Sequence, residues 1–146
     1  MKVFVAGATG AIGRPLLDRL VAAGHEVTAT TRSAERAEGL RACGAEAVVV
    51  DALDAGALRA AVLAARPEVV VNQLTALPHR IDPRHYARDL EATNRLRREA
   101  APVLAAAAAE TGARRVVAQS ISFIQRPEGP PVLDEDRNLD DPSLLA

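Results

Sequence analysis

Residues 2–24, KVFVAGATGAIGRPLLDRLVAAG, are the stretch that decides the fold. The apolar run 2–6 ends at a glycine and predicts a β-strand, and apolar residues at helical spacing after Gly13 predict an amphipathic helix that stops at Gly24. Pro15 falls in the first turn of this helix, where its missing N–H has no intrahelical partner to lose. The stretch therefore predicts a strand, a tight glycine turn and a helix in direct succession.

Three glycines join this strand to this helix at the spacing GxxGxxG. The first permits a sharp turn, the second lets the backbone approach a pyrophosphate, and the third allows the helix to pack closely on the sheet. The free N–H groups and the positive dipole end of the helix would face the phosphates. Because the glycines lie between a strand and a helix, we predict dinucleotide binding rather than a purely structural turn. The loop residues assigned to the cofactor are Gly7, Ala8, Thr9, Gly10, Ala11, Ile12 and Gly13.

Strands and helices continue to alternate along the chain. Further strands are predicted at 26–30, 45–50, 67–72 and 115–120, and further helices at 33–42, 54–65 and 87–110. Ser33 and Asp54 are expected to cap their helices, and Gly44 to end one. This alternation is typical of a parallel sheet with right-handed crossovers. We therefore predict an α/β fold, a doubly wound Rossmann sheet of about five strands in the order 3-2-1-4-5 with helices on both faces.

We expect a single domain to make up most of the chain, because 146 residues are enough to bury one continuous core. We expect residues 1–125 to form the Rossmann domain and residues 126–146, rich in proline and aspartate, to form an exposed tail. Pro102 lies inside the last predicted helix. An interior proline removes a helical hydrogen bond and its ring clashes with the preceding turn. We therefore predict that this helix is kinked or divided at Pro102.

The end of the second predicted strand indicates which dinucleotide is bound. Its residues are Thr30-Thr31-Arg32, without a carboxylate. An Asp or Glu there would bind the adenosine ribose of NAD, whereas an Arg can neutralise the 2′-phosphate of NADP. We predict NADP as the cofactor, with NAD as the alternative, and Arg32 as the main phosphate ligand. Arg14 and Arg36 are candidate helpers, and a solvated surface position is the alternative interpretation of all three arginines.

Polar residues after the third and fourth strands are further candidates. Asp51 could contact the adenine amino group or could simply form the turn before Asp54, and both interpretations stay open. Residues 72–75 end the fourth strand, where backbone and small polar groups could line the path from ribose to nicotinamide. The predicted cofactor residues outside the glycine loop are Thr31, Arg32, Arg36, Asp51, Ala52, Leu53, Gln73, Leu74 and Thr75.

Composition and charge exclude several other functions. A formal net charge of −1 gives no general attraction for nucleic acid or an anionic membrane, so we expect neither partner. The sequence shows no signal-peptide pattern, no apolar run that could cross a bilayer and a single cysteine, Cys43, so we expect a cytoplasmic protein. No metal site is predicted, because Pro83 interrupts the loop that holds His79, Asp82 and His85.

These motifs resemble the short-chain dehydrogenase/reductase superfamily, in its extended or atypical branches of the NAD-dependent epimerase/dehydratase type. The matching segments are 7–13, 23–27, 31–32, Asp51 with Leu53, and 115–120. The first 72 residues equally resemble the nitrogen-metabolite-repression regulator-like proteins, which include NADP-binding sensors. The resemblance implies an oxidoreductase or epimerase that transfers hydride between nicotinamide and a small-molecule substrate, and a homodimer formed by the helices at 54–65 and 87–110. It also implies that this chain stops before a C-terminal substrate region.

The resemblance implies catalytic residues as well. In catalytic members a Ser or Thr after the fifth strand polarises the substrate, and a Tyr-x-x-x-Lys pair transfers the proton. Ser120 and Ser122 are the candidates for the polarising hydroxyl. The single tyrosine is Tyr86, and Leu90 stands four positions later, so the pair is absent from this sequence. Two hypotheses therefore stay open: the cofactor half of an oxidoreductase or epimerase, and a non-catalytic NADP-binding regulator or redox sensor.

Overall fold

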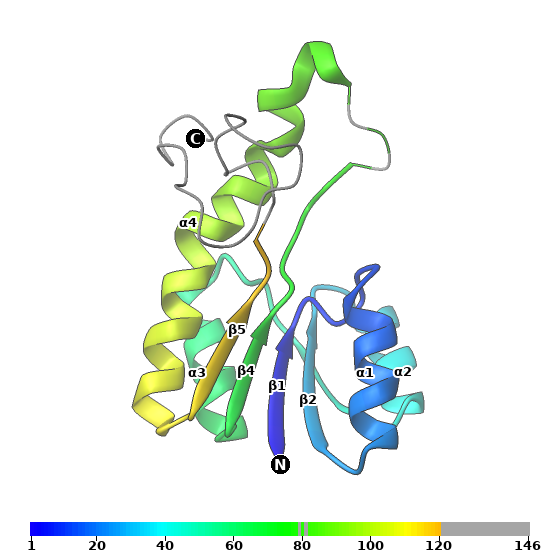
Figure 1. Cartoon of the computed structure of the whole chain (residues 1–146), viewed down its shortest axis with the longest axis vertical. Helices are drawn as coiled ribbons and strands as arrows, with labels where there is room; N and C mark the ends of the chain where they lie inside the picture. The colour runs from blue at the N-terminus through cyan, green and yellow to red at the C-terminus, as the bar shows by residue number, and fades with distance from the viewer. Residues whose placement is uncertain (79, 81, 121–146) are drawn as a thin grey trace, which may run out of the picture.

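Five parallel strands form the centre of the computed structural model, which describes residues 1–78, 80 and 82–120 (Figure 1). Their order, β3-β2-β1-β4-β5, is the predicted one, and the Rossmann-type α/β fold is confirmed. The strands are β1 (Lys2–Ala6), β2 (Glu26–Thr31), β3 (Glu46–Val49), β4 (Val69–Asn72) and β5 (Arg115–Ala118). The helices are α1 (Gly13–Ala22), α2 (Ala34–Ala42), α3 (Ala55–Ala65), the 3₁₀ helix η1 (Pro83–His85) and α4 (Tyr86–Thr111).

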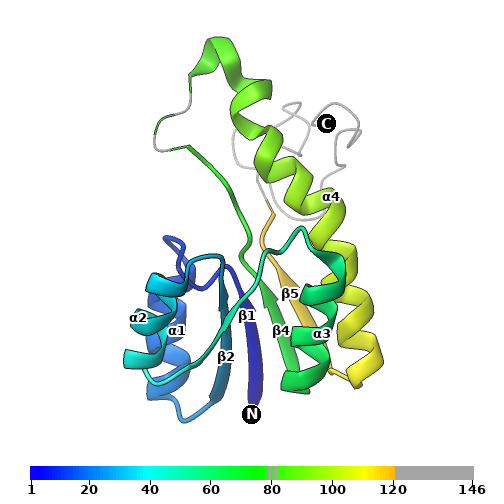
Figure 2. The same ribbon diagram turned by 180° about the vertical axis from the view of Figure 1, so that it is seen from behind.

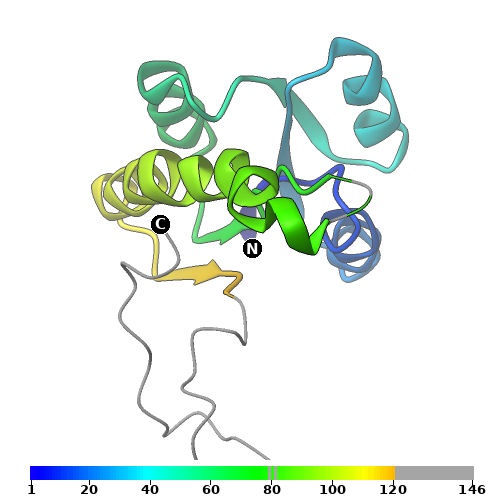
Figure 3. The same cartoon turned by 90° about the horizontal axis from the view of Figure 1, so that it is seen from above.

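The helices cover the sheet in two layers. Seen from above, α1 and α2 lie on one face and α3 and α4 on the other (Figure 3), and the view from behind agrees (Figure 2). Alternate residues of β1 pack against the two helix layers, because successive side chains of a strand point to opposite faces of the sheet. Val3 and Val5 belong to the buried cluster that contains Leu17 of α1, and Phe4 and Ala6 belong to the cluster built by α3 and α4.

Predicted helix caps are present in the structure. The Ser33 hydroxyl accepts a hydrogen bond from the backbone N–H of Arg36 at 3.3 Å, and the Asp54 carboxylate accepts one from Ala57 at 2.9 Å. Gly44 follows α2 with a φ of +89°, as expected of a glycine that ends a helix. The predicted strands at 45–50, 67–72 and 115–120 are each shorter by two residues than expected.

The prediction that the last helix is divided at Pro102 was wrong. α4 runs without interruption from Tyr86 to Thr111 with Pro102 inside it. Pro102 is exposed, whereas Ala100 and Leu104 on either side of it are fully buried in the core. Packing on both sides of the proline therefore holds the helix together and offsets the lost hydrogen bond.

Side-chain contacts attach α4 to its neighbours. Arg59 of α3 forms a two-point ion pair with Glu110, and its Nε lies 2.9 Å from one carboxylate oxygen. This hydrogen bond, together with the charge of the guanidinium, lowers the pKa of Glu110 below its ordinary value. Further along α4, the fully buried hydroxyl of Thr93 accepts a hydrogen bond from the backbone N–H of Ala76 at 2.9 Å. This bond holds the segment after β4 against the helix.

Replacing Pro102 by alanine should stabilise the fold, because it restores a helical N–H at an exposed position. We expect Pro102→Ala to raise the free energy of unfolding by about 1–3 kcal/mol, measured by urea denaturation. Ala106→Pro, at an exposed position one turn further on, is the matched control and should cost about 3 kcal/mol or more. A Pro102→Ala variant less stable than the unmutated chain would contradict this account of α4.

Candidate cofactor site

Loops at the carboxyl ends of the strands enclose a cleft of about 540 Å³. In a parallel sheet these ends share one edge, so the loops after β1, β2, β3 and β4 meet there although they are far apart in the sequence (Figure 1). α4 extends past the same edge and contributes one residue to the wall. The lining residues are Gly7, Thr9, Gly10, Thr30, Thr31, Arg32, Ser33, Glu35, Arg36, Val50, Ala52, Gln73, Leu74, Thr75 and Leu96.

The first and third glycines of the loop are required by the backbone itself. Gly7 has a φ of +86°, and a Cβ added to it would lie 2.5 Å from the carbonyl oxygen of Gln73. A Cβ on Gly13 would lie 2.2 Å from the carbonyl oxygen of Gly7 and 2.8 Å from the Cα of Ala8. The third glycine therefore lets the start of α1 lie close to the turn after β1, and α1 packs on the sheet as predicted, with Leu17 in the same buried cluster as Val3 and Val5.

Gly10 differs from the other two glycines. The nearest atom to a Cβ added there is the Gly7 carbonyl oxygen at 3.4 Å, an ordinary contact, and Gly10 lines the cleft. Within the described chain, a methyl group at this position therefore meets no obstacle. The methyl group would occupy the space in front of the loop, where the phosphates of a ligand would lie.

The start of α1 follows the glycine turn directly and has no side-chain cap. Its N-cap residue is Ile12, whose side chain makes no capping hydrogen bond, whereas Ser33 and Asp54 cap the next two helices. The loop folds on itself through hydrogen bonds from the Gly10 N–H to the Gly7 carbonyl at 3.1 Å and from the Arg14 N–H to the Gly10 carbonyl at 3.0 Å. An uncapped helix start beside a glycine turn is suited to bind an anion.

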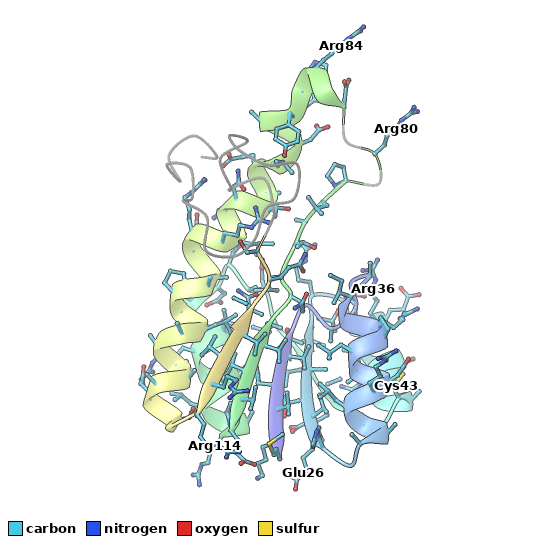
Figure 4. All side chains as sticks on the ribbon, in the orientation of Figure 1. Glu26, Arg36, Cys43, Arg80, Arg84 and Arg114 are labelled. Carbon is cyan, nitrogen blue, oxygen red and sulfur yellow. The ribbon has the colours of Figure 1, made fainter. Side chains whose placement is uncertain are left out.

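Two arginines stand at the β2 side of the cleft. The Thr31 hydroxyl accepts a hydrogen bond from the Ser33 N–H at 3.2 Å, and Ser33 in turn caps α2, so the segment carrying Arg32 and Arg36 is fixed by local bonds. Both arginines line the cleft, and neither takes part in an ion pair with another described residue. Figure 4 shows Arg36 at the loop edge of the sheet and Glu26 at the opposite edge. A positive charge is thus available at this side of the cleft.

The segment after β4 forms the other side. Gln73 donates its backbone N–H to the Ala6 carbonyl at 2.8 Å, and the Asn72 side chain accepts a hydrogen bond from the Leu74 N–H at 3.1 Å. Gln73, Leu74 and Thr75 all line the cleft. The cleft therefore runs across the end of β1, from the arginines beside β2 to the polar segment beside β4.

Several predicted residues lie outside the cleft wall. Asp51 accepts a hydrogen bond from the Leu53 N–H at 3.0 Å, as a turn residue does, and neither residue lines the cleft. Ser120 is exposed, two residues beyond β5, and does not line the cleft, while Ser122 lies outside the described residues. The remaining loop residues that do not line it are Ala8, Ala11, Ile12 and Gly13.

Five lining residues were not expected from the sequence: Thr30, Ser33, Glu35, Val50 and Leu96. Thr30, Ser33 and Glu35 are neighbours of predicted residues, and Val50 directly precedes Asp51, so extending each predicted segment by one position would have included them. Leu96 lies in the middle of α4, where its helical spacing indicates only a core position. No sequence signal could have identified it, because its place in the wall depends on how α4 packs.

A second hollow, of about 360 Å³, lies at the opposite edge of the sheet. Glu26 and Glu46 line it, and the Lys2 amine is 3.8 Å from the Glu26 carboxylate. The Thr28 hydroxyl donates to Glu46 at 3.2 Å. Two carboxylates against one amine would repel phosphates, so this hollow is a poor site for a dinucleotide.

The fold and the first cleft define a Rossmann-type nucleotide-binding domain. A glycine turn, an uncapped helix start and cationic residues at the second strand meet at the carboxyl edge of a parallel sheet, where such domains bind dinucleotides. The chain belongs to the NAD(P)H-binding family whose model matches residues 7–141. The resemblance to short-chain dehydrogenases/reductases of the epimerase type is thereby confirmed.

Individual relatives agree with this assignment. A 3-diazoavenalumate denitrifying reductase from Streptomyces sp. is 53% identical over 141 residues, which are 95% of this chain and 44% of the reductase. The yeast methylglyoxal/isovaleraldehyde reductase Gre2, solved with NADPH, is 26% identical with a TM-score of 0.68, covering 86% of this chain and 39% of Gre2. The Bordetella bronchiseptica enzyme WbmG, solved with NAD and UDP, shares the fold at 22% identity and a TM-score of 0.71, covering 97% of this chain and 44% of WbmG.

This chain therefore spans less than half the length of these relatives. Within the described ranges, none of the helices has the length and apolarity that crossing a bilayer requires.

The three glycines should respond differently to alanine. Gly7→Ala and Gly13→Ala force a Cβ against backbone atoms, and we expect each to lower the free energy of unfolding by about 1–3 kcal/mol. Gly10→Ala should change stability by less than about 0.5 kcal/mol and yet weaken binding of a dinucleotide, measured by calorimetry. Loss of stability in Gly10→Ala equal to that in Gly13→Ala would contradict the geometry described for the loop.

Proposed function

We propose that this chain is the cofactor half of an NADPH-dependent reductase. The observation that carries the proposal is the pair Arg32 and Arg36, which line the cleft beside the glycine turn without a partner in an ion pair among the described residues. The adenosine 2′-phosphate of NADP would lie against them, since β2 ends without a carboxylate to bind a free ribose hydroxyl. Glu35 also lines the cleft, but it stands in the first turn of α2 rather than at the end of β2.

The other contacts follow from the direction of the cleft. The diphosphate would lie over Gly7 and Gly10 at the start of α1, where backbone N–H groups and the helix dipole favour an anion. The nicotinamide would then reach the segment 73–75 beside β4. When bound, the reduced nicotinamide supplies hydride, and this chain fixes the position from which hydride leaves. Asp51, two residues beyond β3, is proposed to accept a hydrogen bond from the adenine amino group on the carboxylate oxygen that does not bind Leu53.

For the substrate we propose a diazo acid, because the relative that is 53% identical is a 3-diazoavenalumate denitrifying reductase. In the corresponding reaction, hydride supplied by the bound nicotinamide would add to the terminal nitrogen of R–N₂⁺ and give R–N=N–H. Loss of dinitrogen would leave the electron pair of the carbon–nitrogen bond on the carbon, which would take the proton released from the N–H bond, giving R–H, N₂ and NADP⁺. The step balances without a proton from the protein.

Ser120 is proposed to contact the substrate. It follows β5 at the same edge of the sheet as the cleft, and its side chain is exposed. A hydroxyl there could orient an oxygen of the substrate beside the nicotinamide. Ser122, the second candidate of the sequence analysis, lies outside the described residues, and it stays a candidate for the same role.

Arg32 should determine the choice between the two cofactors. A charge-assisted hydrogen bond to the 2′-phosphate corresponds to a preference for NADPH over NADH of about tenfold to a hundredfold. Arg32→Ala should remove most of this preference and leave the affinity for NADH nearly unchanged, and the preference should narrow as salt is raised. Calorimetric titration of both cofactors at two salt concentrations measures this.

A matched control is Arg19→Ala, which removes an exposed arginine from the last turn of α1, away from the cleft. It should leave both affinities unchanged. Equal affinities for NADPH and NADH in the unmutated chain, or tighter binding of NADH, would contradict the NADP assignment.

The role as a cofactor half can be tested with a chimera. In the chimera, this chain replaces the matching 141 residues of the Streptomyces reductase. The chimeric protein is then supplied with a ¹⁵N-labelled diazo acid and NADPH. We expect one labelled N₂ for each NADPH oxidised, measured by mass spectrometry and absorbance. A folded chimera that binds NADPH but releases no N₂ would contradict the proposed reaction and favour a regulator or sensor. The chain alone is the control, and we expect it to show no turnover.

A further inference from the structure

Gln73 occupies a fixed position between β1 and β4. Its backbone N–H donates to the Ala6 carbonyl at 2.8 Å, which extends the pairing of β4 with β1 by one residue. Its carbonyl oxygen lies where a Cβ on Gly7 would be only 2.5 Å away. The side chain of Gln73 therefore leaves from a backbone that is held on two sides, directly beside the glycine turn.

The side-chain oxygen of Gln73 has no donor. Among the buried side-chain nitrogen and oxygen atoms of the described residues, Oε1 of Gln73 is the one without a hydrogen-bond partner. The residue lines the cleft together with Gly7, Leu74 and Thr75. Leaving a buried acceptor unpaired destabilises a protein, and such groups are few in native structures, so each one calls for an explanation. Because the residue that carries this unpaired acceptor lines a ligand cleft, the acceptor is suited to a donor that arrives with the ligand.

The strand order determines which part of a dinucleotide can supply that donor. β2 and β4 lie on either side of β1, so Arg32 and Gln73 stand on opposite sides of Gly7. With the 2′-phosphate at Arg32 and the diphosphate at the glycine turn, the nicotinamide riboside half must lie at β4. Phosphate oxygens accept hydrogen bonds and cannot satisfy Oε1. The hydroxyl groups of the ribose are donors.

We propose that Oε1 of Gln73 accepts a hydrogen bond from a hydroxyl of the nicotinamide-side ribose and so sets the position of the nicotinamide along the cleft. The inference rests on the proposed function, because it needs the adenosine end of the dinucleotide at Arg32. Gln73 is thus a positioning residue: it holds the sugar, and the sugar carries the ring from which hydride leaves.

Gln73→Met tests the proposal, because methionine has a similar length and no oxygen. Removing an unpaired acceptor should leave the thermal midpoint of the free chain unchanged or raised, while the affinity for NADP⁺ should fall about three- to tenfold. A purely structural role of Gln73 would move both quantities downward. Gln119→Met is the matched control, since Gln119 follows the next strand, β5, is exposed and does not line the cleft. It should change neither quantity.

Two further ligands locate the contact on the dinucleotide, each titrated by calorimetry against the chain and Gln73→Met. Adenosine 2′,5′-bisphosphate carries the adenosine end alone, and the substitution should not affect its binding. The 3-acetylpyridine analogue of NADP⁺ lacks the carboxamide N–H groups but keeps the ribose hydroxyls, and its affinity should fall as much as that of NADP⁺.

Three results would overturn the proposal. The first is an unchanged affinity of Gln73→Met for NADP⁺, and the second is an equal loss of affinity for adenosine 2′,5′-bisphosphate. The third is an unchanged affinity for the acetylpyridine analogue, which would assign the donor to the carboxamide. An unmutated chain that binds no NADP⁺ would instead overturn the proposed function, and with it this inference.

Discussion

The close approach of Gly7 to the backbone of Gln73 is the contact on which the cleft depends. β1 and β4 are neighbours in the sheet, and at Gly7 the turn after β1 lies so close to the backbone of Gln73, the residue after β4, that there is no room for a side chain. The same turn receives α1, because Gly13 packs against the carbonyl of Gly7. Three elements thus meet without side chains between them. The backbone N–H groups at the start of α1 are thereby brought to the edge where β2 and β4 end.

Local charge, rather than net charge, gives this edge its preference for anions. The chain carries a formal net charge of −1, and the hollow at the opposite edge is lined by Glu26 and Glu46. At the carboxyl edge the helix dipole of α1 adds to the guanidinium groups of Arg32 and Arg36. The two hollows therefore differ in electrostatic character: the direction of the helix dipole follows from the direction shared by all strands, and the charged side chains add to it.

Features with a local physical cause could be predicted from the sequence, and those that depend on packing could not. The caps at Ser33 and Asp54 and the turn at Gly7 follow from the chemistry of single residues, and alternation of strands and helices implied the strand order. The continuity of α4 through Pro102 could not be foreseen, since it depends on Ala100 and Leu104 being buried against distant strands. The glycine loop and the ends of β2 and β4 line one cleft in the structure, and their contact with a cofactor stays a prediction. Leu96 in the cleft wall and the unpaired oxygen of Gln73 emerge only when α4 and β4 are in place.

The central claim is that a dinucleotide binds across the carboxyl ends of β2, β1 and β4, and amide chemical shifts of the ¹⁵N-labelled chain measure this directly. On titration with NADPH, we predict that the largest saturable shifts occur at residues 7–13, 31–36 and 73–75. The amides of Glu26, Thr28 and Glu46, at the opposite hollow, should stay unchanged. The largest shifts at the opposite hollow, or no saturable shift at any described residue, would contradict the account.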